Sequence, residues 1–327
     1  MKKNVIITFD YEVFLGSETG SIENSVIEPT QYALEILKEY NAKAIFFVDA
    51  TWLLFLRENS PLDFKLVSKQ LKDIINAGSS VELHLHPQWL DACKNGDQIE
   101  FKSFDNYRLH SLSDIEILNL FRKSIELLES ITLQKIQCFR AGGFCIEPFA
   151  PIKRAFEECG IIYDFSVAPG MLLNSGNIYD YDFSDAPKLP YYHFQNNVKI
   201  PEPNGLFVEI PLSTYLNNPI YRLTNKFLLK LKKDKIFGNG TGIQEVPNFF
   251  LVSLLRRLQF SRSFLQFDKS SNNFFKFLIK SHFRKSHFLV IISHPKTLSS
   301  QGLLNLAYTT KTFNTLNSID LIKYFIK

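Results

Sequence analysis

Three short polar signatures follow three apolar, strand-like runs of the chain. They are Thr8-Phe9-Asp10-Tyr11-Glu12 after NVII, His84-Leu85-His86-Pro87 after SVEL, and Ser293-His294-Pro295 after FLVII. Folds of the α/β class build their sites where buried strands end. Side chains alternate along a strand, so Asp10 and Glu12 share one face, and so do His84 and His86. Two carboxylates and two imidazoles at one mouth suit a divalent metal with a spare base, which is the chemistry of a metallohydrolase.

Each signature also has a structural interpretation. An acid at a strand end often caps the next helix or pairs with an Arg. A second acid two residues later, with a glycine-containing loop after it, favours a site instead. A single His is usually a core or surface residue, whereas two at i and i+2 project the same way and suit two nitrogen ligands on zinc. Glu82 lies on the same face, either orienting an imidazole or forming a salt bridge at the strand.

Two further residues carry possible chemistry. Arg140-Ala141-Gly142-Gly143 ends a predicted strand. The Arg either closes a surface ion pair before an ordinary glycine turn, or holds an active-site carboxylate ionised and oriented. His294 follows five apolar residues, which makes a surface role unexpected and suits a general acid at a strand end.

The elements that position these residues alternate along the chain. We predict strands over 4–9, 44–48, 80–85, 137–141, 161–165 and 288–292, and helices over 29–40, 63–77, 113–130, 150–159 and 317–326. Ser113 and Glu116 form a capping-box pattern, and Gly78 and Gly160 end their helices. Strands alternating with helices imply parallel βα units within one large α/β domain. Residues 166–215 are expected to be irregular, and 216–285 show no β alternation.

Composition narrows the class of protein. No apolar run approaches the roughly 18 residues of a membrane span, and the run after Met1-Lys2-Lys3 is broken at Asp10, which argues against secretion by a signal peptide. The four cysteines lack zinc-ribbon spacing, which favours reduced thiols in the cytosol. Between Arg222 and Lys285 there are 14 Lys and Arg against three acids, in a chain whose net charge is +4. This stretch is either an interfacial amphipathic element or a solvated basic face. No nucleic-acid-reading motif accompanies it.

The motifs in this order resemble the NodB-homology polysaccharide deacetylases of the carbohydrate esterase family 4 type. The order is Thr-Phe-Asp, a His pair, Arg with small residues, Asp164-x-Ser166 and Ser-His-Pro. The branch it is most similar to occurs in bacterial surface-polysaccharide gene clusters. The resemblance covers residues 4–170 and 287–327. It implies an α/β fold, a distorted (β/α)7-type barrel with a helical or irregular insert, that holds one divalent metal in an Asp/Glu–His–His site. From the geometry of the His pair we expect this ion to be zinc.

The resemblance also implies a role for each residue. Asp10 matches the general base, His84 and His86 the metal histidines, Arg140 the tether of the base, and His294 the general acid. The usual second Asp is Tyr11 here, so the acidic ligand shifts to Glu12. The family's two histidines lie four residues apart, whereas here they are His-x-His. The family's Arg-x-Pro has become Arg-Ala-Gly.

These motifs lead us to expect an N-deacylase of N-acyl amino sugars in surface-polysaccharide biosynthesis. Its substrate would be nucleotide- or lipid-linked, and it would work in the cytoplasm or at the inner membrane face, with peripheral membrane contact through 216–285. We expect one domain over 1–327 with an irregular, basic insert at 171–286. Two other functions stay open: a non-catalytic glycan- or lipid-binding member of the fold, and a metal amidohydrolase of a small non-sugar amide.

Overall fold

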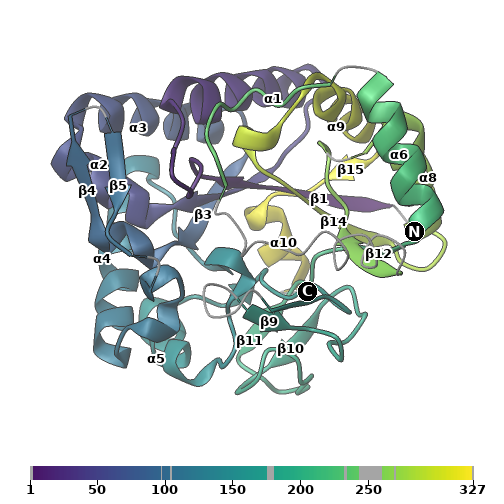
Figure 1. The fold of residues 1–327 in the computed structure, drawn as a ribbon. Coiled ribbons are helices and arrows are strands. Elements are labelled where there is room, and N and C mark those ends of the chain that lie inside the picture. Colours follow the sequence, from purple (N-terminus) through teal and green to yellow (C-terminus); the bar gives the residue numbers. More distant parts are fainter. Residues whose placement is uncertain are drawn as a thin grey trace.

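A computed structural model describes residues 3–96, 98–103, 105–174, 180–231, 234–242, 260–268 and 270–325. Its centre is a curled sheet in which the strands follow the order β10-β11-β7-β6-β3-β2-β1-β14, with β15 also paired to β1 (Figure 1). Every pair in this sheet is parallel except β10 with β11. The prediction of an α/β, distorted barrel of βα units is confirmed.

The strands of this sheet are short and mostly buried, as expected of a largely parallel sheet covered by helices. Their bounds are β1 (Asn4–Tyr11), β2 (Ile45–Asp49), β3 (Ser80–Leu85), β6 (Cys138–Ala141), β7 (Tyr163–Asp164), β10 (Tyr192–Phe194), β11 (Phe207–Glu209), β14 (Phe288–Ser293) and β15 (Asn314–Thr315). The covering helices are α1 (Glu28–Glu39), α2 (Ala50–Asn59), α3 (Pro61–Asn76), α4 (Asp114–Thr132), α5 (Ala150–Cys159), α9 (Ser300–Thr312) and α10 (Ser318–Phe325).

Alternation along β1 decides which side chains reach the site. Phe9 and Tyr11 point outward: Phe9 stacks on Phe46, and the Tyr11 hydroxyl donates to Gln70 on α3. Thr8 and Asp10 point the other way and both contact Arg140. Side chains therefore alternate between the two faces of β1, as predicted. Tyr11 lies on the face away from the candidate site, so it cannot be a ligand.

The barrel is closed between β11 and β14 by backbone that does not form a regular strand. Ser213 N donates to Val290 O, and Leu265 N donates to Ser213 O. Ser213 Oγ also accepts from Val290 N at 3.0 Å. The segment after β11 thus crosses the gap that the open sheet leaves.

Several expected boundaries were wrong. The expected irregular stretch 166–215 contains β8 (Leu172–Asn174), β9 (Asp180–Asp182), β10 and β11. Because β10 and β11 join the central sheet, these parts of 171–286 belong to the barrel rather than to an insert. Helices α2 and α9 were not predicted. Six of the ten residues in α2 are buried, so this helix lacks the alternation of faces that marks an exposed one.

The basic stretch 216–285 also holds strands, against expectation. β12 (Thr214–Asn217) pairs antiparallel with β13 (Ser261–Phe264), and α6 (Pro219–Leu231) and α8 (Asn272–His282) accompany them. The partner of β12 lies more than 40 residues away, so local sequence patterning cannot reveal the pair. Residues 243–259 of this stretch lie outside the described residues. Among the described helices, none is both long and apolar enough to span a membrane.

Candidate metal centre

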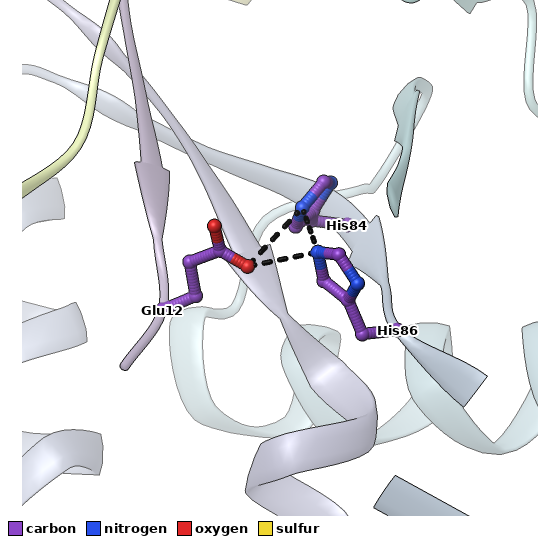
Figure 2. Close-up of side chains that lie close together, drawn as sticks. All are labelled: Glu12, His84 and His86. Atoms are coloured by element: carbon purple, nitrogen blue, oxygen red, sulfur yellow. Dashed lines mark hydrogen bonds and ion pairs between the residues drawn. The ribbon is translucent and has the colours of Figure 1, made fainter. Parts of the chain in front are cut away.

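Two parallel strands bring three ligand-type side chains together at their carboxyl ends. Glu12 directly follows β1, His84 lies in β3, and His86 follows β3 by one residue. In Figure 2 the carboxylate of Glu12 points at both imidazoles from the opposite side of a small gap. All three residues are buried. The two histidines predicted as an i, i+2 pair do project to the same side, and Glu12 faces them.

The distances fit a small divalent cation. Glu12 Oε2 lies 2.9 Å from His86 Nε2 and 3.6 Å from His84 Nε2, and the two Nε2 atoms are 3.1 Å apart. Ligands of tetrahedral zinc, with bonds of about 2.0–2.1 Å, stand about 3.4 Å from one another. The three atoms therefore have the spacing that an ion between them requires.

The orientation of the His84 imidazole supports the same conclusion. His84 Nδ1 lies 2.7 Å from the carbonyl oxygen of Arg140, and a carbonyl only accepts. Nδ1 therefore carries the proton in neutral His84, and Nε2 presents its lone pair to the gap. A carboxylate oxygen facing the buried Nε2 lone pair of His84 is unfavourable unless a cation lies between them. This donor set fits a divalent metal.

His86 is positioned through its backbone and its ring. Its N–H donates to Thr51 Oγ1 at 2.9 Å, and Thr51 in turn donates to Asp49 at the end of β2. The ring packs edge-on against Tyr107, with centroids 5.2 Å apart. A Cβ at Gly142 would come within 2.8 Å of His86 Nδ1. The small residues of Arg-Ala-Gly-Gly thus make room for this imidazole.

Glu12 has a partner that sequence reasoning missed, Lys296. Its Nζ donates to Glu12 Oε1 at 3.0 Å and to the carbonyl of Val13 at 2.8 Å. Burial alone would raise the pKa of Glu12, but the charges of Lys296 and His86 hold that pKa well below its usual value. Lys296 therefore keeps Glu12 ionised and occupies one of its oxygens, which leaves Oε2 for the gap. In the sequence, only the position of Lys296 two residues after His294 indicated that it could lie near the site.

Asp10 is held beside this trio by Arg140. The fully buried guanidinium donates to Asp10 Oδ1 through Nη1, to Thr8 Oγ1 through Nη2 at 3.0 Å, and to Phe165 O through Nε at 3.1 Å. It also lies over the ring of Phe47, 4.3 Å from the centroid. With its donors fixed on three partners, the guanidinium sets the orientation of the Asp10 carboxylate.

His294 lies between the two acids. Its Nε2 is 3.6 Å from Asp10 Oδ2 and 3.6 Å from Glu12 Oε1. Burial lowers the pKa of His294, and the nearby carboxylates of Asp10 and Glu12 oppose that effect. The His294 side chain is 21% exposed, whereas the side chains of Glu12, His84 and His86 are 2–5% exposed. Of these four side chains, His294 is therefore the one that reaches solvent.

All six predicted site residues meet at this one place, but Glu82 does not join them. Its Oε2 accepts from the backbone N–H groups of Gln137 and Cys138, which is neither of the two roles left open for it, orienting an imidazole or forming a salt bridge. Asp164, next to the strand end, hydrogen-bonds Ser166 and the buried Glu209. Glu209 was missed because its short strand, β11, was missed.

Residues 1–146 match the sequence profile of the family described as polysaccharide deacetylase. That range contains Asp10, Glu12, His84, His86 and Arg140. The resemblance to the NodB-homology polysaccharide deacetylases is confirmed.

Solved structures give the extent of the likeness. A Mycobacterium smegmatis protein provisionally described as a polysaccharide deacetylase is 14% identical, with a TM-score of 0.50 over 99% of this chain and 90% of its own. At that identity the likeness concerns the fold. A family 4 carbohydrate esterase pseudoenzyme from Bacillus anthracis (16%, TM-score 0.43) covers 98% of this chain and 66% of its own. A family 4 carbohydrate esterase from Streptomyces lividans (14%, TM-score 0.32) covers 50% and 62%. No curated protein matches the chain.

Proposed function

We propose that this protein is a metal-dependent N-deacetylase of an N-acyl amino sugar, with zinc as the ion. One observation carries the proposal: a three-ligand gap formed by Glu12, His84 and His86 lies beside a carboxylate fixed by a buried Arg and a histidine that reaches solvent. A deacetylase needs this combination, because it must activate water and protonate a poor leaving group. The family description supports the reaction type.

An ion held by Glu12 Oε2, His84 Nε2 and His86 Nε2 would polarise the acyl carbonyl and lower the pKa of a water molecule, from 15.7 towards about 7. The chain's own residues do the rest. Arg140 leaves Oδ2 of Asp10 as the free oxygen of that carboxylate. We assign this oxygen as the general base that takes the proton of the attacking water.

His294 is assigned as the general acid. Departure of an amine anion is prohibitively slow, so the nitrogen must receive a proton as the C–N bond breaks. His294 Nε2 lies 3.6 Å from Asp10 Oδ2, which gives the proton taken by Asp10 a short path to the leaving nitrogen. The products are a free amino sugar and acetate, or formate where the substrate is a formamide.

For the substrate we propose a nucleotide- or lipid-linked N-acetyl sugar in bacterial surface-polysaccharide biosynthesis. The sequence motifs support this substrate class, because they resemble most the branch of the family that occurs in bacterial surface-polysaccharide gene clusters. The experiment described below also distinguishes two other functions. A non-catalytic glycan-binding member would bind the sugar and release no acid, and an amidohydrolase of small amides would hydrolyse non-sugar amides better than any sugar.

The deciding experiment combines metal analysis of the purified protein with acetate release from a panel of nucleotide-linked N-acetyl sugars. We expect about one zinc per chain, and acetate release that chelation abolishes and zinc restores. His84→Ala should lose the metal, whereas His110→Ala, whose imidazole contacts Pro148 O elsewhere, should keep it. Unchanged metal content in His84→Ala would refute the ligand assignment. His294→Ala should keep the metal and lose activity, most severely with poor leaving groups.

A further inference from the structure

Helix α6 carries an apolar stripe on its outer side. Among the described residues of this helix, none is buried. Ile220, Leu223, Phe227 and Leu231 are 61–73% exposed, and their spacing of three and four residues places them along one line of the helix. Water-exposed apolar side chains in such a row are characteristic of a surface that another partner covers.

The stripe faces outward because the other side of α6 is held by the protein. Tyr221 packs on Phe274 and Phe277 of α8, with centroids 5.6 and 5.9 Å apart. Asn225 Oδ1 accepts from the backbone of Ser271 at 2.8 Å. The two helices lie at one edge of the molecule, at the right of Figure 1. The stripe is therefore a fixed feature of the surface.

The charges around the stripe have one sign. Lys226 and Lys230 are exposed on the side of α6 next to the apolar row. Helices α6 and α8 together contain five Lys and Arg residues and no carboxylate. A partner that covers the stripe must therefore offer negative charge beside apolar material.

We propose that the α6 stripe, with Lys226 and Lys230 beside it, is a docking surface for an anionic phospholipid membrane. The apolar row enters the interface, while Lys226 and Lys230 lie at the level of the headgroups. Each basic residue near an anionic leaflet strengthens binding, and screening by salt weakens that contribution. The inference is independent of the proposed hydrolysis.

The docking surface is remote from the candidate metal centre. Lys3, just before β1, lies over the ring of Phe283, just after α8, at 5.4 Å. The carboxyl end of α8 thus borders the amino end of β1, whereas Glu12 follows the carboxyl end of that strand. Substitutions on the stripe should leave hydrolysis of a soluble substrate unchanged, and this separates failure of the docking proposal from failure of the proposed function.

The test is co-sedimentation of the full-length protein with phosphatidylcholine vesicles, with and without phosphatidylglycerol, across a salt series. We expect binding only to the anionic vesicles, weakening as salt rises. The triple variant L223S/F227S/L231S and the charge variant K226A/K230A should each bind about tenfold or more weakly. The matched control L62S/L66S/I115S, which removes exposed apolar side chains on α3 and α4, should bind as the wild type does.

Three results would overturn the proposal. The first is no binding to either vesicle at low salt, which is the outcome if another part of the chain covers the stripe. The second is equal binding to neutral and anionic vesicles. The third is a concentration-dependent dimer in sedimentation velocity that L223S/F227S/L231S abolishes, because the stripe would then be an interface between copies of this chain. Circular dichroism of each variant verifies that it is folded.

Discussion

The candidate centre is a balance of buried charges. Glu12 and Asp10 supply two carboxylates, and Arg140 and Lys296 supply a cation for each of them. Each carboxylate thereby keeps one oxygen committed to its cation and one free for chemistry. Buried ionised groups are tolerable only when they are paired in this way. The free oxygen of Glu12 faces the two imidazoles and suits a metal ligand. The free oxygen of Asp10 lies beside them and suits a base.

Replacing Asp10 by Asn should remove the base and spare the metal. Thr8, Phe165 O and the ring of Phe47 still hold Arg140, and none of the three ligand-type atoms is changed. We expect unchanged metal content and a 10²–10⁴-fold loss of hydrolysis, which is the usual contribution of a general base. Metal analysis and acetate release measured on the same sample check this. Wild-type turnover would show that the base lies elsewhere.

Lys296→Met should make metal binding more sensitive to acid. The charge of Lys296 helps to hold the pKa of Glu12 well below its usual value, so removing it raises that pKa. Protons then compete with the ion for Glu12 at higher pH than in the wild type. We measure zinc affinity by competition with a chromophoric chelator while the pH is lowered. We expect the variant to lose its affinity at a higher pH than the wild type does. Lys296→Arg keeps the charge and serves as control; identical profiles for all three proteins would contradict the idea.

At the scale of elements, Glu82 joins β3 to its neighbours. Its carboxylate accepts from the backbone of Gln137 and Cys138 at the start of β6 and interacts with Ser318 at the start of α10. Burial, opposed by these hydrogen bonds, raises its pKa to about 7. The contact stabilises the end of the barrel opposite the candidate centre.

This raised pKa gives a pH dependence whose sign can be worked out. The folded state binds the proton more tightly than the unfolded state, whose pKa is near 4.5. The stabilisation is complete below pH 4.5 and is lost as pH rises through 7, by up to about 3 kcal/mol. In urea denaturation, Glu82→Gln should therefore gain stability relative to the wild type between pH 5 and pH 8. A constant difference between the two proteins across that range would refute the assignment.

At the scale of elements, the two glycines of Arg-Ala-Gly-Gly make room for neighbouring side chains. A Cβ at Gly142 would collide with Leu85 O and the His86 ring, and one at Gly143, whose φ is +57°, would collide with Tyr107. Glycine at both positions therefore lets His86 and Tyr107 pack next to this turn.

For the whole molecule, the strands that carry the site residues could be predicted from the sequence. The pairing of short strands that lie far apart in the chain could not. Strands β1, β3 and β14 are apolar runs that end in polar signatures, so sequence alone placed Asp10, His84 and His294 at one edge. β11 has three residues, and its neighbour β7 lies more than 40 residues earlier in the chain, so no local pattern marked it. Lys296 was missed for a different reason: nothing in His-Pro-Lys says that the Lys side chain turns back to Glu12.

The segment 234–242 closes the molecule over the loop that follows Glu12. Gly16 N donates to Thr241 O, and Thr241 N donates to Glu18 O. Asp234 at the other end of the segment accepts from Ser299 Oγ and Gln301 N, at the start of α9. A segment distant in sequence thereby holds together the loops that carry Glu12 and Lys296.

Two glycines at this contact allow a matched test. A Cβ at Gly16 would come within 2.3 Å of Gly242 O and 2.4 Å of Thr241 O, whereas a Cβ at Gly242 would meet nothing within 4 Å. Gly16→Ala must therefore push backbone apart, and we expect a loss of about 1–3 kcal/mol in the free energy of unfolding. Gly242→Ala should stay within about 0.5 kcal/mol of the wild type. Urea denaturation of both variants checks this, and equal stabilities would mean that 234–242 does not hold the Glu12 loop. Gly16→Ala should also weaken zinc binding, because the displaced loop begins at the residue after that ligand.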